Sequence, residues 1–259
     1  MNKVSVAKTF SKAAASYDDA AHLQRHIADE LFAKLKSVHV PRGGTALDMG
    51  TGTGYCLPKL QQLARPDHII AADISSDMLN IARRKLPEVE TRVCDLEAEP
   101  FAANSIDVAV SSLAVQWLES PALFIQHMQK ALRPGGVMAL ATLGPRTLWE
   151  LRQAWAMVDD VPHVNRFHDG IHWLEPVWEC GFETILWREQ RLQVRYQSPM
   201  TLLHELKQLG ASHVDRPAAP GRNRLRQMLQ CYEQFRCRDG HFPATWDVYY
   251  LIVRKPELS

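Results

Sequence analysis

The stretch Thr45-Ala46-Leu47-Asp48-Met49-Gly50-Thr51-Gly52-Thr53-Gly54-Tyr55-Cys56-Leu57-Pro58-Lys59-Leu60 decides how this chain folds. It predicts a short buried strand, then a glycine turn, then a helix. Glycines at 50, 52 and 54 remove Cβ at alternate positions, so the backbone can adopt unusual φ values and a ligand can approach it closely. The helix N-terminus that follows offers unpaired N–H groups and a partial positive charge. Such turns bind nucleotide-like ligands in open α/β sheets.

The details of the turn argue against a dinucleotide-binding dehydrogenase. The dinucleotide fingerprint is G-x-G-x-x-G, but here the third glycine comes one residue early and Tyr55 stands in its place. Asp48 ends the strand, and a carboxylate there suits an ammonium group better than a pyrophosphate. The pattern D-x-G-x-G-x-G resembles motif I of the class I S-adenosylmethionine (SAM) methyltransferases. The alternative is a glycine turn that serves only the tight packing of strand on helix.

Length and composition favour one large α/β domain. The 259 residues allow a sizeable core, with room for a small inserted subdomain. A formal net charge of +1 gives no indication of a nucleic-acid partner. The N-terminus has no apolar signal core, and no apolar run is long enough to span a membrane, so we expect a cytoplasmic protein without membrane attachment. The five cysteines form no C-x-x-C pair and are expected to be reduced thiols.

Short apolar runs alternate with helical patterns through the first 142 residues. The predicted strands cover 45–49, 68–73, 91–95, 105–112 and 137–142. Helices are predicted over 20–38, after the glycine turn, after a cap at Ser76-Asp77, and over 120–132, where Arg133-Pro134-Gly135-Gly136 ends the last of them. This alternation predicts a parallel, doubly wound α/β sheet. The resemblance to class I methyltransferases implies a Rossmann-like sheet of seven mostly parallel strands.

The pattern loosens after residue 142. Helices are predicted over 147–158, 200–209 and 222–236, and strands over 182–196 and 246–253. Residues 159–175 are polar, aromatic and rich in histidine, without a clear period. We expect one methyltransferase domain over 1–259, with an N-terminal helical lid over 1–38. Residues 146–178 and 199–240 are expected to form further lid or insert segments.

Three predicted strands end in an acid, at Asp48, Asp73 and Asp95. Ligands in open α/β sheets bind outside these strand ends, so three acids in register with a glycine loop indicate a binding site. The methyltransferase resemblance implies that Asp48 helps to hold the methionine ammonium and Asp73 the ribose hydroxyls. It implies that Asp95, with the N–H of Leu96, reads the adenine edge. The other implied cofactor-binding residues are Gln24, Gly50, Gly52, Gly54, Ile74, Met78 and Ser111, although for Met78 plain core packing is an equal alternative.

Other kinds of site have weaker support. His22 and His26 are one helical turn apart, as are His168 and His172, but neither pair has an acid or cysteine at ligand spacing, so no metal site is expected. A G-x-S-x-G elbow is absent. The segment 112–117 does not resemble the Asn/Asp-Pro-Pro-Tyr signature of amino-group methyltransferases. Basic residues gather late in the chain, where they form either an ordinary solvated face or a docking surface for an acidic partner: Arg188, Arg191, Arg195, Arg216, Arg222, Arg224 and Arg226.

Over nearly its full length the chain resembles the malonyl-acyl-carrier-protein O-methyltransferases of biotin biosynthesis, the BioC group. The loop motifs identify only the superfamily. The segments that narrow the resemblance are Gly144-Pro145-Arg146-Thr147-Leu148 and Leu206-Lys207-Gln208-Leu209-Gly210-Ala211, together with Phe10 to Tyr17, Leu113 to Trp117 and a late Tyr232. The chain departs from the usual pattern mainly over 159–181, where lid contacts stay open.

This resemblance implies transfer of the SAM methyl group to the free carboxylate of a malonyl thioester, with S-adenosylhomocysteine as the product. The acceptor partner would be malonyl-acyl-carrier protein or malonyl coenzyme A, with no nucleic acid and no membrane involved. Because a carboxyl group with a pKa of roughly 4 is ionised at pH 7, the reaction needs no general base. Arg146 is the candidate cation for the carboxylate, and Tyr17 and Gln116 are candidate hydrogen-bond donors. The alternatives are a methyltransferase for another small acid or a quinone precursor, and a SAM-binding regulator without catalysis.

Overall fold

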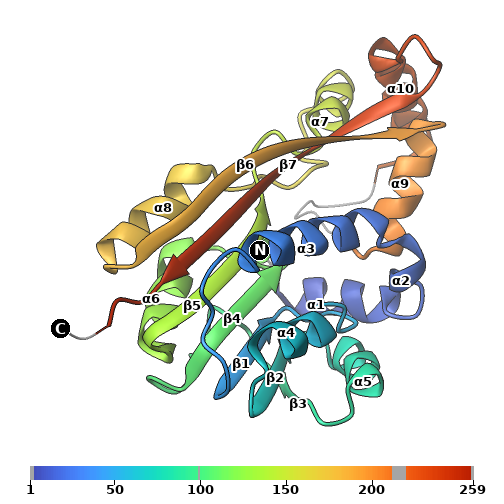
Figure 1. Ribbon diagram of the computed structural model, residues 1–259. Coiled ribbons are helices and arrows are strands. Elements are labelled where there is room, and N and C mark those ends of the chain that lie inside the picture. The colour runs from blue at the N-terminus through green and yellow to red at the C-terminus, as the bar shows by residue number, and fades with distance from the viewer. Residues whose placement is uncertain (1–2, 99, 212–219, 258–259) are drawn as a thin grey trace.

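The computed structural model describes residues 3–98, 100–211 and 220–257. A seven-stranded sheet runs through its centre in the order β3-β2-β1-β4-β5-β7-β6 (Figure 1). The strands are β1 (Thr45–Met49), β2 (His68–Asp73), β3 (Glu90–Val93), β4 (Ile106–Ser112), β5 (Leu132–Leu143), β6 (Glu183–Tyr196) and β7 (Phe242–Arg254). The first five pair in parallel, whereas β7 runs antiparallel to both β5 and β6. The prediction of a doubly wound, mostly parallel, seven-stranded sheet is confirmed.

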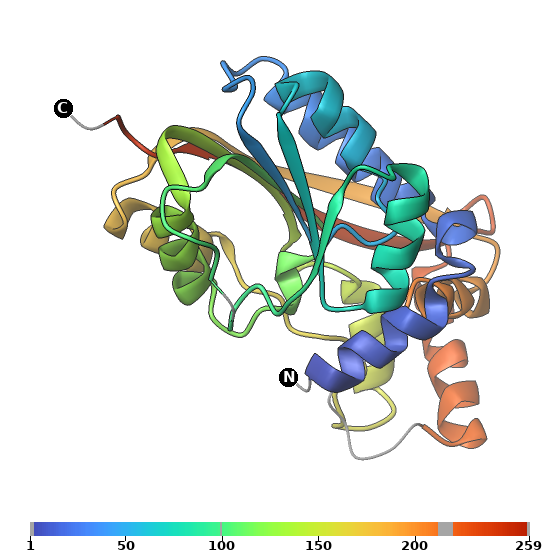
Figure 2. The same cartoon turned by 90° about the horizontal axis from the view of Figure 1, so that it is seen from below.

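Helices cover both faces of the sheet. α3 (His22–Leu35), α4 (Leu57–Ala64) and α5 (Ser76–Lys85) lie on one face, and α6 (Pro121–Ala131) and α8 (Gly170–Glu179) lie on the other (Figures 1 and 2). Apolar residues of α3 recur at helical spacing, and Ile27, Leu31 and Leu35 are completely buried. Each of them contributes about 1.5–3 kcal/mol through burial. On the opposite face the side chains of Phe124 and Trp173 are buried in the same way.

Further helices lie around the sheet ends. α1 (Lys3–Ala13) and α2 (Tyr17–Ala20) precede α3, and η1 (Val115–Trp117) follows β4. α7 (Trp149–Ala156), α9 (Pro199–Gln208), α10 (Arg222–Tyr232) and η2 (Glu233–Phe235) gather near the end of the long β6–β7 pair (Figure 1). Residues 212–219, which fall within the predicted 199–240 segment and include Arg216, lie outside the described residues.

Several local predictions differ from the structure. The strand expected over 91–95 is β3 at Glu90–Val93, so Asp95 lies beyond its end and not at its last position. The stop expected at 133–136 is already part of β5, because Gly135 donates from its backbone N–H to Lys255 and Gly136 accepts from the N–H of Lys255. α8 lies in a region with no predicted period, although Pro176 interrupts its pattern and Asp169 caps its start. The cap of α5 is Ser75, whose Oγ accepts from the N–H of Met78, and not Ser76-Asp77.

Candidate active site

The glycine loop connects β1 to α4 at the point where the sheet order reverses, between β1 and β4. Gly50, Gly52 and Gly54 all have positive φ, at 67°, 53° and 83°. A Cβ on Gly50 would lie 2.0 Å from Cβ of Ala114, so this position admits no larger residue without movement. A Cβ on Gly52 would meet no protein atom within 4 Å, and its side of the loop therefore faces open space. Crevices at such reversal points are where open α/β sheets bind ligands.

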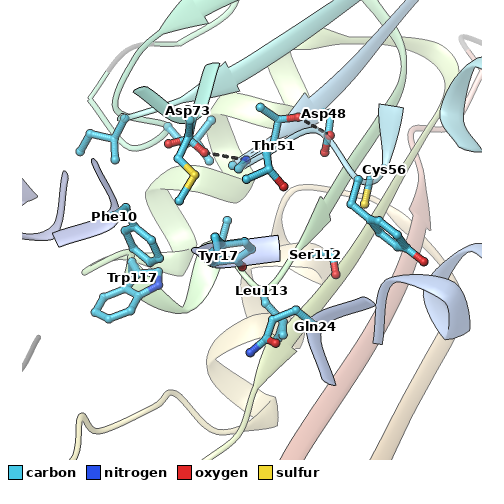
Figure 3. A pocket seen from close by; sticks show the side chains of 18 of the residues that line it. Phe10, Tyr17, Gln24, Asp48, Thr51, Cys56, Asp73, Ser112, Leu113 and Trp117 are labelled. Carbon is cyan, nitrogen blue, oxygen red and sulfur yellow. Dashed lines mark hydrogen bonds between the residues drawn. The ribbon is translucent and has the colours of Figure 1, made fainter. Parts of the chain in front are cut away.

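Two strand-end acids brace this loop. Asp73 accepts from the backbone N–H of Gly52 at 2.9 Å and from that of Ser75 at 2.8 Å (Figure 3). Asp48 accepts from the Thr51 hydroxyl at 2.6 Å. Both carboxyl groups are buried, and burial raises the pKa of Asp48 to about 7, against the opposing effect of the Thr51 hydrogen bond. Burial likewise raises the pKa of Asp73, although three backbone N–H groups act to lower it. The site thus holds carboxyl groups that a bound cation or hydrogen-bond donor would stabilise in their ionised form.

A large cavity of about 1100 Å³, part of it open to solvent, lies over the loop. Most of the predicted cofactor residues line it: Gln24, Asp48, Gly50, Gly52, Asp73, Ile74, Met78, Asp95 and Leu96. Gly54 does not, since a Cβ there would press on Ala82 of α5, which makes it a packing glycine. Ser111 does not either, because it is fully buried and donates to the carbonyl of Met49. The neighbouring Ser112 lines the cavity in its place.

Polar contacts of three residues, Lys3, Ser11 and Asp18, hold the N-terminal segment over this cavity. The Lys3 ammonium lies 2.8 Å from the Asp95 carboxylate and also pairs with Glu97. Ser11 and Ser75 share a hydrogen bond of 2.8 Å between their hydroxyls. The same segment meets the core again at Asp18, which accepts from Thr53 and pairs with Lys85. The view from below shows α1 lying across the carboxyl ends of the strands (Figure 2).

A second, smaller cavity of about 540 Å³ adjoins the first. The two share one wall, made of Phe10, Tyr17, Gln24, Leu113 and Trp117. The rings of Phe10 and Trp117 meet edge to face at 5.6 Å, which joins α1 to η1 across this wall. The rest of the second cavity is mainly apolar and aromatic, with Gln116 and Asn165 among its polar residues. Of the residues predicted to act on the acceptor, Tyr17 and Gln116 therefore line this cavity.

Arg146 lines neither cavity. Its side chain is exposed, and its backbone N–H donates to Asp247 at the loop that follows β5. The role of Arg146 as a carboxylate clamp therefore stays a prediction. Lys3, Phe10, Leu113 and Trp117 line the site and were missed from the sequence as individual site residues. Only proximity to the predicted lid and to the end of β4 could have indicated them.

Other predicted features form no site in the described part of the chain. His168 and His172 have ring centroids 5.4 Å apart, but no group of three or more possible metal ligands was found among residues 3–98, 100–211 and 220–257. No helix of these residues has the length and apolarity to cross a membrane. None of the five cysteines, all of which lie in the described residues, forms a disulfide. Arg222, Arg224 and Arg226 are exposed on α10, and Arg224 pairs with Asp159.

The chain is similar to known methyltransferases. A family model described as a methyltransferase domain matches residues 47–140. A malonyl-[acyl-carrier protein] O-methyltransferase of Halorhodospira halophila is 36% identical over 257 residues, which cover 95% of this chain and 85% of that protein. A SAM-dependent methyltransferase of Mesorhizobium loti, solved as a crystal structure, shares the fold with a TM-score of 0.54 and 16% identity, over 86% of this chain and 95% of that one.

Longer proteins also match. The biotin biosynthesis bifunctional protein BioHC of Teredinibacter turnerae is 36% identical over 97% of this chain, and the chain spans 46% of its length. The chain thus covers about half of the bifunctional relatives but most of the single-function ones. With more than a third of its residues shared with a relative of nearly its own length, the chain belongs to the malonyl-[acyl-carrier protein] O-methyltransferase family of class I methyltransferases.

Proposed function

We propose that this chain transfers the methyl group of SAM to the free carboxylate of malonyl-acyl-carrier protein, giving the malonyl methyl ester used in biotin synthesis. The observation that carries the proposal is the pair of cavities with one shared wall. One has strand-end acids around a glycine loop, and the other is apolar with a few neutral polar groups. The sequence relatives support the same acceptor.

The residues of the larger cavity fit SAM. Asp73 keeps lone-pair capacity beside its backbone contacts and would accept hydrogen bonds from the ribose hydroxyls. Asp48 would face the methionine ammonium, and Ile74 and Met78 would pack on the adenine, whose edge Asp95 and Leu96 would read. When bound, SAM supplies an activated methyl group on a sulfonium. We propose that Gly50 and Gly52 let the backbone approach the methionine portion.

The chemistry asks little of the protein beyond alignment. A carboxylate oxygen forms the new bond to the methyl carbon, while the carbon–sulfur bond breaks and its electron pair stays on sulfur. No proton moves, so no general base is needed, in keeping with the neutral polar groups of the second cavity. The protein's part is to hold oxygen, carbon and sulfur in line and to exclude water, and α1 and η1 cover the site for this purpose.

The decisive experiment offers the purified protein labelled SAM with a panel of acceptors. The panel contains malonyl-acyl-carrier protein, malonyl coenzyme A, several other small acids and a quinone precursor. Turnover restricted to malonyl thioesters is the expected result. Turnover of another acid or of the quinone precursor would replace the proposed substrate. Binding of SAM without turnover of any acceptor would favour the non-catalytic regulator.

We propose that the carrier protein docks beside α10. Arg222, Arg224 and Arg226 are exposed there, and acidic carriers would be attracted to them over a distance set by ionic strength. Replacing all three by Ala should slow turnover of the carrier substrate at low salt and much less at high salt. Coenzyme A thioesters should be affected less. Wild-type turnover of the carrier substrate at low salt would make this an ordinary solvated face.

We further propose one domain with a ligand-ordered lid made of residues 1–38 and the 146–178 region, and with 199–240 as a further lid or insert segment. The contacts of Lys3, Ser11 and Asp18 support the first of these. Limited proteolysis with and without S-adenosylhomocysteine should show cleavage in the lid only in the free protein. Identical cleavage in both states would argue against the lid. A cytoplasmic location is part of the proposal, and five cysteines without a disulfide among the described residues are in keeping with it.

A further inference from the structure

The cationic side chains at the two cavities, Lys3 and Arg25, both line the first cavity and are paired there, Lys3 with Asp95 and Glu97 and Arg25 with Asp18. Among the described residues that line the second cavity there is no Lys, Arg or His. Arg146, the residue expected to supply the charge, is exposed and lines neither cavity. The polar groups that remain at the shared wall are neutral.

A neutral site suits this nucleophile. The sulfonium that donates the methyl is itself a positive charge beside the carboxylate, so the ion pair forms between the two reactants. A guanidinium would take up both carboxylate oxygens through a bidentate contact and withdraw their charge from the reaction. Neutral donors that hold one oxygen leave the other oxygen to attack.

Gln24 has the position and the free hydrogen-bonding capacity for this task. It lies in the first turn of α3 and lines both cavities. In Figure 3 its side chain lies beside Leu113, with Tyr17 between it and Asp73. Its Oε1 atom is buried without a hydrogen-bond partner in the described structure. Buried amide groups are almost always paired, so an unpaired one at a cavity wall indicates a missing ligand.

Gln116 offers a contrast at the same cavity. Its Nε2 donates to the carbonyl of Leu113 at 2.6 Å, which fixes the direction of the amide. Its unpaired buried atom is therefore the acceptor Oε1, which would repel a carboxylate. Gln24 has no such side-chain contact and can turn its amide so that Nε2 points at the ligand. Gln116 keeps a second N–H, but the bond to Leu113 fixes the direction of its amide, whereas Gln24 has no side-chain hydrogen bond within the described residues to fix its own.

Tyr17 supplies the second donor. Its side chain lines both cavities, and burial together with the nearby Asp73 raises the pKa of its phenol. The hydroxyl therefore keeps its proton at any pH at which the protein works, and it can donate to a carboxylate throughout. Phe10 and Trp117 complete the wall with apolar rings.

We propose that Gln24 binds the carboxylate of the acceptor through its side-chain amide, with the Tyr17 hydroxyl as a second donor, and that it is not a cofactor-binding residue. The inference rests on the proposed function, because it assigns the acceptor site of that reaction. In this proposal the preference for the free acid over its methyl ester depends on the amide of Gln24.

The test compares two variants, Gln24→Met and Gln24→Glu, with the same two changes at Gln193, which is exposed on β6. Each protein is loaded with S-adenosylhomocysteine and titrated with malonyl coenzyme A and with its methyl ester. We expect Gln24→Met to bind the acid about tenfold or more weakly, the loss typical of a hydrogen bond to a charged group. Gln24→Glu should bind it more weakly still and should reverse the preference for acid over ester. Both Gln193 variants should match wild type.

The outcomes separate the possible failures. The dissociation constant for S-adenosylhomocysteine, measured by calorimetry, should change by no more than about twofold in any variant. If affinity for S-adenosylhomocysteine falls together with acid binding, Gln24 serves the cofactor and the inference is overturned. If both Gln24 variants keep the wild-type preference for acid, the amide does not hold the carboxylate. If the wild type binds the acid through Gln24 but never methylates it, the proposed reaction fails while the carboxylate site stands. If the wild type does not bind the acid, both fail.

Discussion

Binding of S-adenosylhomocysteine should release a proton from Asp48. In the free protein this carboxyl group is buried, with Thr51 as its hydrogen-bond partner, and its pKa is raised to about 7 by burial. A ligand ammonium beside it favours the ionised form and lowers that pKa. Below pH 7 the Asp48 carboxyl group therefore holds a proton that it must give up when the ligand binds. The affinity for S-adenosylhomocysteine should thus rise with pH.

The size of the effect follows from that pKa. Asp48 is ionised in about a tenth of the molecules at pH 6 and about nine tenths at pH 8. If only the ionised form binds well, affinity should rise about tenfold between these two values. Binding should release about 0.9 proton at pH 6 and about 0.1 at pH 8.

Calorimetric titration in buffers of different ionisation enthalpy measures both quantities. Asp48→Asn keeps an acceptor for the Thr51 hydroxyl but has no titratable proton. We expect this variant to bind more weakly and with little pH dependence, and any proton exchange left in it reports other groups, Asp73 included. Equal affinity at pH 6 and pH 8 in the wild type, with no proton released, would refute the reasoning.

Three further changes test the same site. Asp73→Ala should weaken binding of SAM by about 1–3 kcal/mol, through lost ligand contacts and a loosened loop, as measured by calorimetry; unchanged affinity in the folded variant would remove Asp73 from the cofactor site. Gly52→Val should be worse for binding and should cost about 1–3 kcal/mol of stability in a denaturant titration, since φ is 53° there; normal SAM affinity would show that the loop's open side faces no ligand. Lys3→Ala should expose α1 to protease even with S-adenosylhomocysteine bound, and an unchanged cleavage pattern would mean that the ion pair does not hold the cover.

The parallel half of the fold could be predicted from sequence because its signals are local. β1, β2 and β4 are short apolar runs that end at an acid or a turn, and a helix follows each of them. α8 was not predicted, because Pro176 and polar residues interrupt its helical spacing of apolar residues. Burial of Trp173 and Val177 stabilises this helix only within the folded protein. The start of β5 was not predicted because Lys255, the residue that pairs with it, lies far away in the sequence.

For the candidate site, the sequence predicts which residues lie near the sheet edge better than it predicts where their side chains point. Asp48 and Asp73 follow from strand ends, because parallel strands bring their carboxyl ends to one edge, and Asp95, two residues past the end of β3, lines the same cavity. Arg146 also follows a strand, yet its side chain is exposed, and nothing in its neighbours indicates which way a loop residue points. Lys3 comes to the site only through the path of α1 across the sheet, which depends on tertiary packing.

The place of β7 has a consequence for how the protein is made. This strand is the last in the sequence, yet it lies between β5 and β6, and its partners in β5 are more than a hundred residues earlier. During synthesis the N-terminal strands can assemble as they emerge, but β6 has no place in the sheet until β7 has been made. Until then β5 presents an open, apolar edge to other chains in the cell. Pairing over such a distance is also slow, so the newly made chain spends its most aggregation-prone interval waiting for its final strand.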